Sequence, residues 1–194
     1  TRTGERAWHF QIVHHDIWNF DLPTAPILLD VNTEQGPTKI VAQPTKQGLV
    51  YTFNRETGEP IWPIEEVPFP ASIVPGEQLA ATQPIPTKPA PFDMQGLSLD
   101  TLVDFTPEIR AQAIAAVADY QLGPLFNPPI HRDNPLGKIS SMICPSGAVN
   151  ITHPSVADPT TGILYVTSRS SCAARPLVSG EEADTYYDAP TGTT

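Results

Sequence analysis

The phrase Thr3-Gly4-Glu5-Arg6-Ala7-Trp8 returns as Thr57-Gly58-Glu59-Pro60-Ile61-Trp62, with Thr, Gly, Glu and Trp in register. A third, partial copy runs from Asp158 to Val166. Thr-Gly favours a tight turn because glycine takes a positive φ without steric cost, and the apolar residues that follow suit a buried strand. A period of roughly 50 residues is typical of propeller blades, where a Trp ring packs between neighbouring sheets. The repeat therefore predicts an all-β, repetitive architecture, with coincidence of common turn dipeptides as the competing explanation.

The length of the chain limits how much of such an architecture it can hold. A closed propeller needs at least about four blades of four strands, and 194 residues have room for about three blades and an insertion. The chain also opens inside a repeat phrase and closes on a polar Gly/Pro/Thr stretch. We therefore interpret it as a partial propeller, a fragment of a longer protein.

The charge balance restricts the partners. The formal net charge is −10, with 11 Lys and Arg against 21 Asp and Glu, which argues against a nucleic-acid partner because phosphate backbones demand a basic surface. No apolar run reaches the ~20 residues that span a bilayer. Cys144 and Cys172 allow either one disulfide or two buried thiols.

Alternating apolar residues predict strands at residues 5–15, 39–43 and 48–54, with a turn at Lys46-Gln47-Gly48 between the last two. Leu49, Tyr51 and Phe53 share one face of the third segment while Val50 lies opposite, as in a strand packed on both sides. Further strands are expected near residues 148–157 and 162–168. These segments place propeller blades at residues 1–62 and a further blade with a polar tail at residues 143–194, all in one domain.

Residues 63–142 are expected to form an insertion. Many of the 23 prolines lie between Pro60 and Pro91, where they deny any central strand its hydrogen bonds and predict an ordered but irregular excursion. Thr106 as N-cap and Pro107 at the first position then predict a helix over about 107–121. Its apolar stripe is expected on Ile109, Ala113, Val117 and Tyr120.

Ionisable residues crowd the stretch from Val13 to Asp21. In a purely structural interpretation, His14 and His15 satisfy backbone groups at a strand end and Asp16 caps a turn. A zinc site is disfavoured, because adjacent histidines point to opposite sides of a strand and the HEXXH spacing is absent. The alternative is a catalytic or binding cluster.

The string from Trp8 to Pro23, followed by Pro44-Thr45-Lys46-Gln47-Gly48 and Thr57-Gly58, resembles the pyrroloquinoline quinone (PQQ)-dependent dehydrogenases, nearest the membrane-bound glucose dehydrogenase branch. The resemblance implies an eight-bladed propeller in which a sugar or alcohol passes hydride to PQQ and electrons leave to a quinone or cytochrome acceptor. It also implies calcium or magnesium, with ligands expected outside this chain. A periplasmic or periplasm-facing location, with membrane attachment through a separate N-terminal segment, belongs to the same expectation.

Carried over by resemblance, Lys46 contacts the quinone oxygens, where an ammonium stabilises the negative charge of reduction. His15 and Asn150 are the other candidate cofactor contacts, although Ile151 stands where the family usually has Trp after that Asn. Asn150 is also a plausible turn residue, and a Lys before Gly in a hairpin is commonly just solvated.

The resemblance places an Asp as general base where this chain has Asn19, and an amide cannot accept a proton. Three explanations remain open: Asp21, Asp16 or His14 serves as base; Asn19 orients substrate while water carries the proton; or the propeller keeps its fold without catalysing. The third corresponds to a binding or scaffold module of the bacterial envelope. A serine hydrolase ranks low because no Gly-x-Ser-x-Gly elbow is present.

Overall fold

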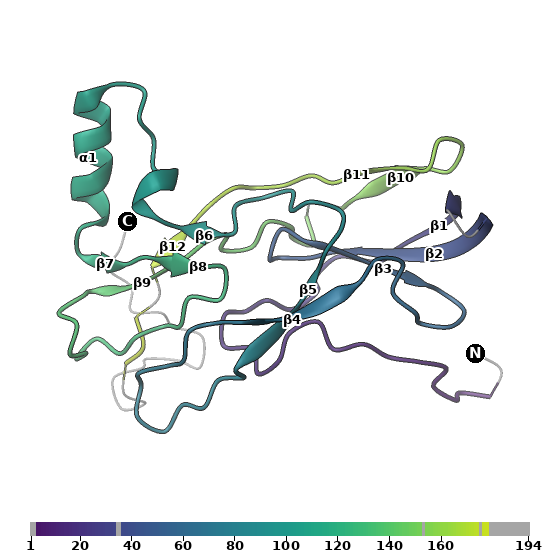
Figure 1. Ribbon diagram of the computed structural model, residues 1–194, viewed down its shortest axis with the longest axis horizontal. Helices are drawn as coiled ribbons and strands as arrows, with labels where there is room; N and C mark the ends of the chain where they lie inside the picture. The colour runs from purple at the N-terminus through teal and green to yellow at the C-terminus, as the bar shows by residue number, and fades with distance from the viewer. Residues whose placement is uncertain (1–2, 34–35, 153, 175, 179–194) are drawn as a thin grey trace.

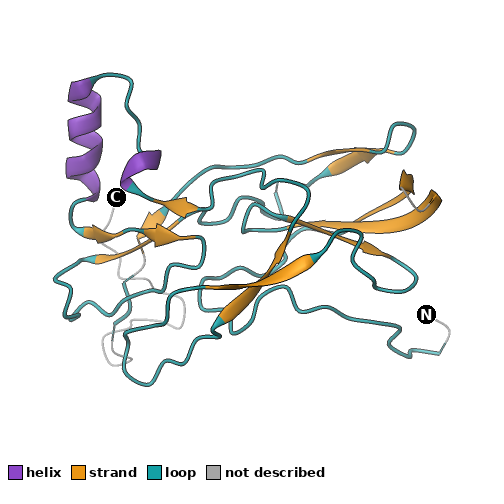
Figure 2. Ribbon diagram, in the orientation of Figure 1, coloured by secondary structure: helices purple, strands orange, loops and turns teal. Residues whose placement is uncertain are grey.

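The computed structural model describes residues 3–33, 36–152, 154–174 and 176–178. Within this part of the chain, short strands form small, mostly antiparallel sheets joined by long loops (Figures 1 and 2). The strands are β1 (Ile27–Thr33), β2 (Gly36–Pro44), β3 (Val50–Asn54), β4 (Ile64–Pro68), β5 (Thr82–Pro86), β6 (Gly96–Leu97), β7 (Tyr120–Gln121), β8 (Gly123–Pro124), β9 (Ser140–Ile143), β10 (Val156–Asp158), β11 (Ile163–Tyr165) and β12 (Ala173–Ala174). The helices are η1 (Leu99–Thr101) and α1 (Pro107–Val117). The predicted β architecture with one α-helix is confirmed.

The largest sheet is the antiparallel meander β1-β2-β3. Ile27 pairs with Ala42 and Ile40 with Asn54, so the strands predicted at 39–43 and 48–54 are confirmed. Strand β3 is buried from Val50 to Phe53, with Tyr51 fully covered, as expected for a strand packed on both sides. The sheet therefore supplies a rigid base for the turn that joins β2 to β3.

The strand predicted over residues 5–15 is wrong. This segment runs extended beneath the meander but forms no ladder with the described strands. Its aromatic residues pack instead, with the Trp8 ring 5.6 Å from that of Phe53. Near its end the Gln83 amide replaces a neighbouring strand: its Oε1 accepts from His14 N–H and its Nε2 donates to His14 C=O, both at 2.8 Å. The backbone is thus satisfied by a side chain, which periodicity cannot reveal.

The first two copies of the repeat contact each other. Trp8 of the first copy lies against Gly58 of the second, where an added Cβ would be 2.6 Å from the indole ring. Trp8 Nε1 donates to the carbonyl of Arg55 at 3.1 Å, and Gly58 N–H donates to Asn54 C=O at 2.8 Å. At these two copies, the Trp of the first therefore covers the Thr-Gly turn of the second.

The Pro-rich excursion is more regular than expected, because β4 and β5 pair as an antiparallel ribbon with Glu66 opposite Pro84. A two-stranded ribbon has no central strand, so proline can occupy positions that need no ladder hydrogen bond. The helix begins as predicted, with Thr106 Oγ1 accepting from Ile109 N–H at 3.3 Å. It ends at Val117 rather than residue 121, since Tyr120 enters β7.

The apolar stripe expected on α1 is only partly covered. No residue of the helix is buried, Ala113 and Val117 are half-buried and Ile109 is exposed, and the helix projects away from the meander (Figure 2). In the C-terminal part, β10 and β11 are shorter than the strands expected there, and residues 148–152 form no strand. Cys144 and Cys172 form a disulfide, which resolves the two alternatives left by the sequence. No helix in the described ranges is long and apolar enough to cross a bilayer.

The hydrophobic core joins the N-terminal motif to the segment around Phe126. The Trp18 and Phe20 rings each meet Phe126 edge-on, at 5.1 and 5.5 Å, and all three side chains are buried. Trp18 Nε1 also donates to the carbonyl of Asn127 at 2.8 Å. Because both residues that flank Asn19 are fixed in this core, the position of Asn19 is fixed as well.

Candidate functional site

The motif segment turns sharply at Asp16. Its carboxylate accepts from the backbone N–H groups of Trp18 at 2.8 Å and Phe20 at 2.7 Å. His15 and Asn19 adopt positive φ values of 50° and 65°, a region that Asn and His enter more readily than most residues. The structural interpretation of Asp16 as a turn cap is confirmed, and the turn presents Asn19 at its far end.

Lys46 lies in the turn between β2 and β3 and meets this segment. Its Nζ donates to Asn19 Oδ1 at 3.2 Å and forms an ion pair with the carboxylate of Asp21. The Lys46 side chain is only 15% exposed, whereas that of Asp21 is 58% exposed. Three residues singled out from the sequence therefore meet in space, although 25 residues separate Asp21 from Lys46.

The two histidines lie in other pairs. His14 Nε2 is 3.1 Å from Glu66 Oε1, and His15 Nε2 is 2.7 Å from Glu77 Oε1. Hydrogen bonds from Thr82 and His14 hold the pKa of Glu66 below its usual range. Within the described residues neither histidine contacts Lys46. Both carboxylate oxygens of Asp16 accept hydrogen bonds from backbone N–H groups.

Asn150 lies in a loop that is next to the turn of Lys46. This loop is fastened to the lysine turn by Ala148 N–H, which donates to Lys46 C=O at 2.9 Å. Beside it is a polar hollow of about 240 Å³, lined by Ser146, Gly147, Asn150, Arg169, Ser171 and Cys172. Asn150 thus lines a cavity beside the turn that carries Lys46.

Sequence reasoning missed Asp93, whose carboxylate fastens the C-terminal segment beside this hollow. Ser168 Oγ and Ser170 Oγ each donate to it, the latter at 2.9 Å. Its backbone is also close to the lysine turn, because a Cβ on Gly48 would lie 2.8 Å from Asp93 Cβ. No local signal could have identified Asp93, since its serine partners are 75 and 77 residues away.

The described residues contain no group of three or more His, Cys, Asp or Glu side chains suited to a metal ion. The expectation of calcium or magnesium ligands outside this chain stays an expectation.

A protein-family model described as "PQQ: Glucose/ethanol/alcohol dehydrogenase, beta-propeller domain" matches residues 1–193. Among curated relatives, a quinoprotein glucose dehydrogenase of Gluconobacter oxydans (strain 621H) is 40% identical over 84 residues, which make up 43% of this chain and 10% of that protein. A probable quinate dehydrogenase (quinone) of Xanthomonas campestris pv. juglandis is 43% identical over 84 residues, 43% of this chain and 11% of the relative.

A quinate/shikimate dehydrogenase (quinone) of Acinetobacter baylyi is 42% identical over 83 residues, 42% of this chain and 10% of the relative. No solved structure matches the chain. The matched segments are therefore only about a tenth of the length of these relatives.

Proposed function

Because this chain belongs to the β-propeller family of PQQ-dependent glucose, ethanol and alcohol dehydrogenases, we propose that it forms part of a quinoprotein that oxidises a sugar or alcohol at bound PQQ. The observation that carries the proposal is the contact of Lys46 Nζ with Asn19 Oδ1 and with the Asp21 carboxylate. This arrangement joins a cation, an amide and a carboxylate at one point.

The residues at this point suit the cofactor that the family implies. A Cβ on Gly147 would meet only Lys46 Cγ, at 3.9 Å, so the backbone leaves open space beside the lysine. Lys46 and Asn19 offer an ammonium and an amide here, and the hollow by Gly147 adds the Asn150 amide, a guanidinium and hydroxyls. These donors match an anionic quinone rich in oxygen acceptors. Lys46, Asn19 and Asn150 are the residues that would hold it, with no metal ligand assigned.

Bound PQQ supplies the two-electron oxidation of a substrate C–H bond, and the protein supplies position and charge. Lys46 carries its positive charge at Nζ, and its side chain is mostly shielded from water, so the ammonium stabilises developing negative charge more strongly than an exposed lysine would. The core contacts of Trp18 and Phe20 hold Asn19 in place to orient the substrate hydroxyl by hydrogen bonding.

The hydroxyl proton needs an acceptor, and we assign this role to Asp21. The Asn19 amide has no basic site, and both Asp16 oxygens accept from backbone N–H groups. The carboxylate of Asp21 is exposed and lies against Lys46, within reach of any hydroxyl that Asn19 orients. His14 is the weaker alternative because Glu66 holds its ring.

A sugar or polyol substrate, a membrane quinone as acceptor and a periplasm-facing location complete the proposal. They rest on the family and on relatives described as glucose and quinate dehydrogenases, two of them with quinone as acceptor.

The test is reconstitution of the polypeptide, in its full encoded length, with PQQ and calcium, followed by artificial-dye reduction with sugars, alcohols and polyols. Dye reduction that depends on PQQ is expected. If PQQ binds but no substrate reduces the dye, the scaffold alternative replaces the enzyme, and Asn19 in place of the family's acid becomes its explanation.

The proton acceptor has its own test. Asp21→Asn should lower the rate by about 10²- to 10⁴-fold, the usual contribution of a general base. Adding Asn19→Asp to that variant should restore part of the loss, because it returns a carboxylate to the position beside Lys46. Asp100→Asn, which removes an exposed acid on η1, is the matched control. An Asp21→Asn enzyme as fast as this control would exclude Asp21 as the base.

A further inference from the structure

The hollow beside Asn150 is lined by the side chain of one cation, Arg169, and lies next to the turn that carries Lys46. Arg169 N–H donates to Ala148 C=O at 2.9 Å, and Ala148 N–H donates to Lys46 C=O at the same distance. The backbones of Arg169 and Lys46 therefore flank the loop of residues 146–150 from its two sides. The positive charge that Arg169 brings to the lining favours an anion there.

Local geometry turns Arg169 towards the hollow. The segment between β11 and β12 runs nearly straight (Figure 1), and side chains on an extended segment alternate in direction. Ser168 and Ser170 face the carboxylate of Asp93, to which both donate. Arg169 and Ser171 therefore point the other way, and both line the hollow.

The charge of Arg169 is not used elsewhere in the described structure. None of the described acidic residues forms an ion pair with its guanidinium. The nearby Asp93 carboxylate accepts instead from Ser168 and Ser170, the two neighbours of Arg169 in the chain. In the lining of the hollow, Arg169 is the charged residue, and the others offer hydroxyl, amide and backbone groups. A guanidinium that forms no ion pair with the described residues and lies among neutral donors suits a planar anion that it can bind through two N–H groups.

The frame around the hollow is firm. Ser146 N–H donates to Ser171 C=O at 2.8 Å, and the two hydroxyls are 3.0 Å apart. The disulfide between Cys144 and Cys172 closes the same end, and Cys172 Sγ lies 3.5 Å from Met94 Sδ. A pocket held at three points costs little conformational entropy when it binds a ligand.

We propose that the pocket of Ser146, Gly147, Asn150, Arg169 and Ser171 binds a carboxylate group, with Arg169 as the charge that selects it. The preference for a carboxylate follows from the lining of the pocket. Only the identity of the molecule that carries this carboxylate rests on the proposed function. PQQ is a tricarboxylate, and a hydroxy-acid substrate such as quinate presents one carboxylate beside its hydroxyls. The experiment separates these two sources.

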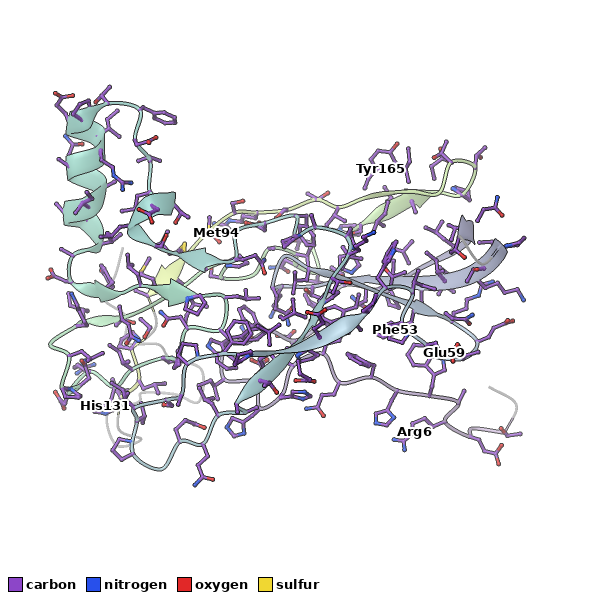
Figure 3. The ribbon with its side chains drawn as sticks, viewed as in Figure 1. Arg6, Phe53, Glu59, Met94, His131 and Tyr165 are labelled. Atoms are coloured by element: carbon purple, nitrogen blue, oxygen red, sulfur yellow. A yellow bond between two sulfur atoms is a disulfide. The ribbon has the colours of Figure 1, made fainter. Side chains whose placement is uncertain are left out.

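The experiment compares wild type with Arg169→Gln, which removes the charge, and Arg169→Lys, which keeps it. Arg6→Gln is the control, because Arg6 is exposed and lies far from Met94 at the disulfide (Figure 3). On the apo-protein in its full encoded length, titration calorimetry measures the dissociation constants of PQQ, quinate and methyl quinate, the last being the uncharged analogue.

Arg169→Gln should raise the dissociation constant of one carboxylate ligand about ten- to a hundredfold, which is the contribution of a charge-assisted hydrogen bond. Arg169→Lys should recover part of the lost affinity. Weaker PQQ binding assigns the carboxylate to the cofactor. Weaker quinate binding with unchanged methyl quinate assigns it to the substrate. If neither ligand loses more in Arg169→Gln than in Arg6→Gln, the proposal is overturned. Because these are binding measurements, failure of dye reduction in the wild type counts against the enzyme alone.

Discussion

The contact between the first two copies of the repeat predicts that Gly58→Ala destabilises the fold far more than the same change in the other two copies. Gly4, Gly58 and Gly162 share the Thr-Gly phrase and nearly the same φ, +74°, +80° and +71°. An L-residue in this region costs about 1–2 kcal/mol, reduced by the lower entropy of the unfolded alanine chain. This backbone cost is common to all three sites.

Only at Gly58 does the new methyl group collide with the core. Its Cβ would lie 2.6 Å from the indole ring of Trp8, about 1 Å closer than carbon contacts allow. The ring would have to move, which disturbs its hydrogen bond to Arg55 C=O, worth about 0.5–1.5 kcal/mol, and its contact with Phe53, of similar size. We therefore expect a loss of about 2–4 kcal/mol at Gly58.

The controls come from the other two copies. An added Cβ at Gly4 meets nothing within 4 Å, and at Gly162 it meets only Val31 Cγ1 at 3.4 Å. Each should cost about 1 kcal/mol. Urea unfolding followed by far-ultraviolet circular dichroism measures the three free energies without depending on tryptophan fluorescence. Equal losses at Gly58 and Gly162 would refute the packing argument, as would an unchanged cost of Gly58→Ala in a Trp8→Ala background.

Two further predictions concern stability. Tyr51 is buried and donates to Pro84 C=O at 2.6 Å, and burial raises the pKa of its hydroxyl above the ordinary value of 10.0. Above pH 10 the folded state therefore keeps a proton that the unfolded state loses, so the free energy of unfolding is full below pH 10 and falls as the pH rises further. Tyr51→Phe should make this alkaline fall smaller. Urea unfolding measured from pH 8 to 11 tests this. Replacing Cys144 and Cys172 by serine opens a loop of 28 residues and should cost about 3–4 kcal/mol in the same assay, while addition of a reductant should leave the serine variant unchanged.

The parts of the fold that follow from local pattern could be predicted from the sequence. Strands β2 and β3 show a period of two, and the turn between them ends at Gly48, whose φ of +77° suits glycine alone. Residues 5–15 show the same period, yet no strand forms. The difference lies in the partner: β3 has β2 next to it in the chain, whereas the N-terminal segment is held by Gln83, a side chain that no periodicity reports.

The residues of the candidate site also fall into two groups, those that the sequence could identify and those that it could not. Lys46 and Asn19 could be named because the phrases around them resemble a known family, and Asp21 because it lies two residues after Asn19. Asp93 and Arg169 could not, since each acts through partners that only the folded chain brings near. Arg169 faces the pocket because its neighbours on both sides are drawn to Asp93, a relation that the string Ser-Arg-Ser does not contain.

The chain has an amide at position 19, where related chains are expected to have an acid, and the backbone conformation there is one possible reason. Its φ of 65° lies in the left-handed region, which Asn and Asp both tolerate, so the conformation does not require the amide. Asn19→Asp should therefore change the free energy of unfolding by less than about 0.5 kcal/mol, whereas Asn19→Ala should cost about 1–2 kcal/mol because Ala lacks that tolerance. An Asp at 19 would share one ammonium with Asp21, and two neighbouring carboxylates raise the pKa of one of them. A large loss of stability in Asn19→Asp at neutral pH, recovered at pH 5, would show that this site cannot hold both acids and that the amide is retained for that electrostatic reason.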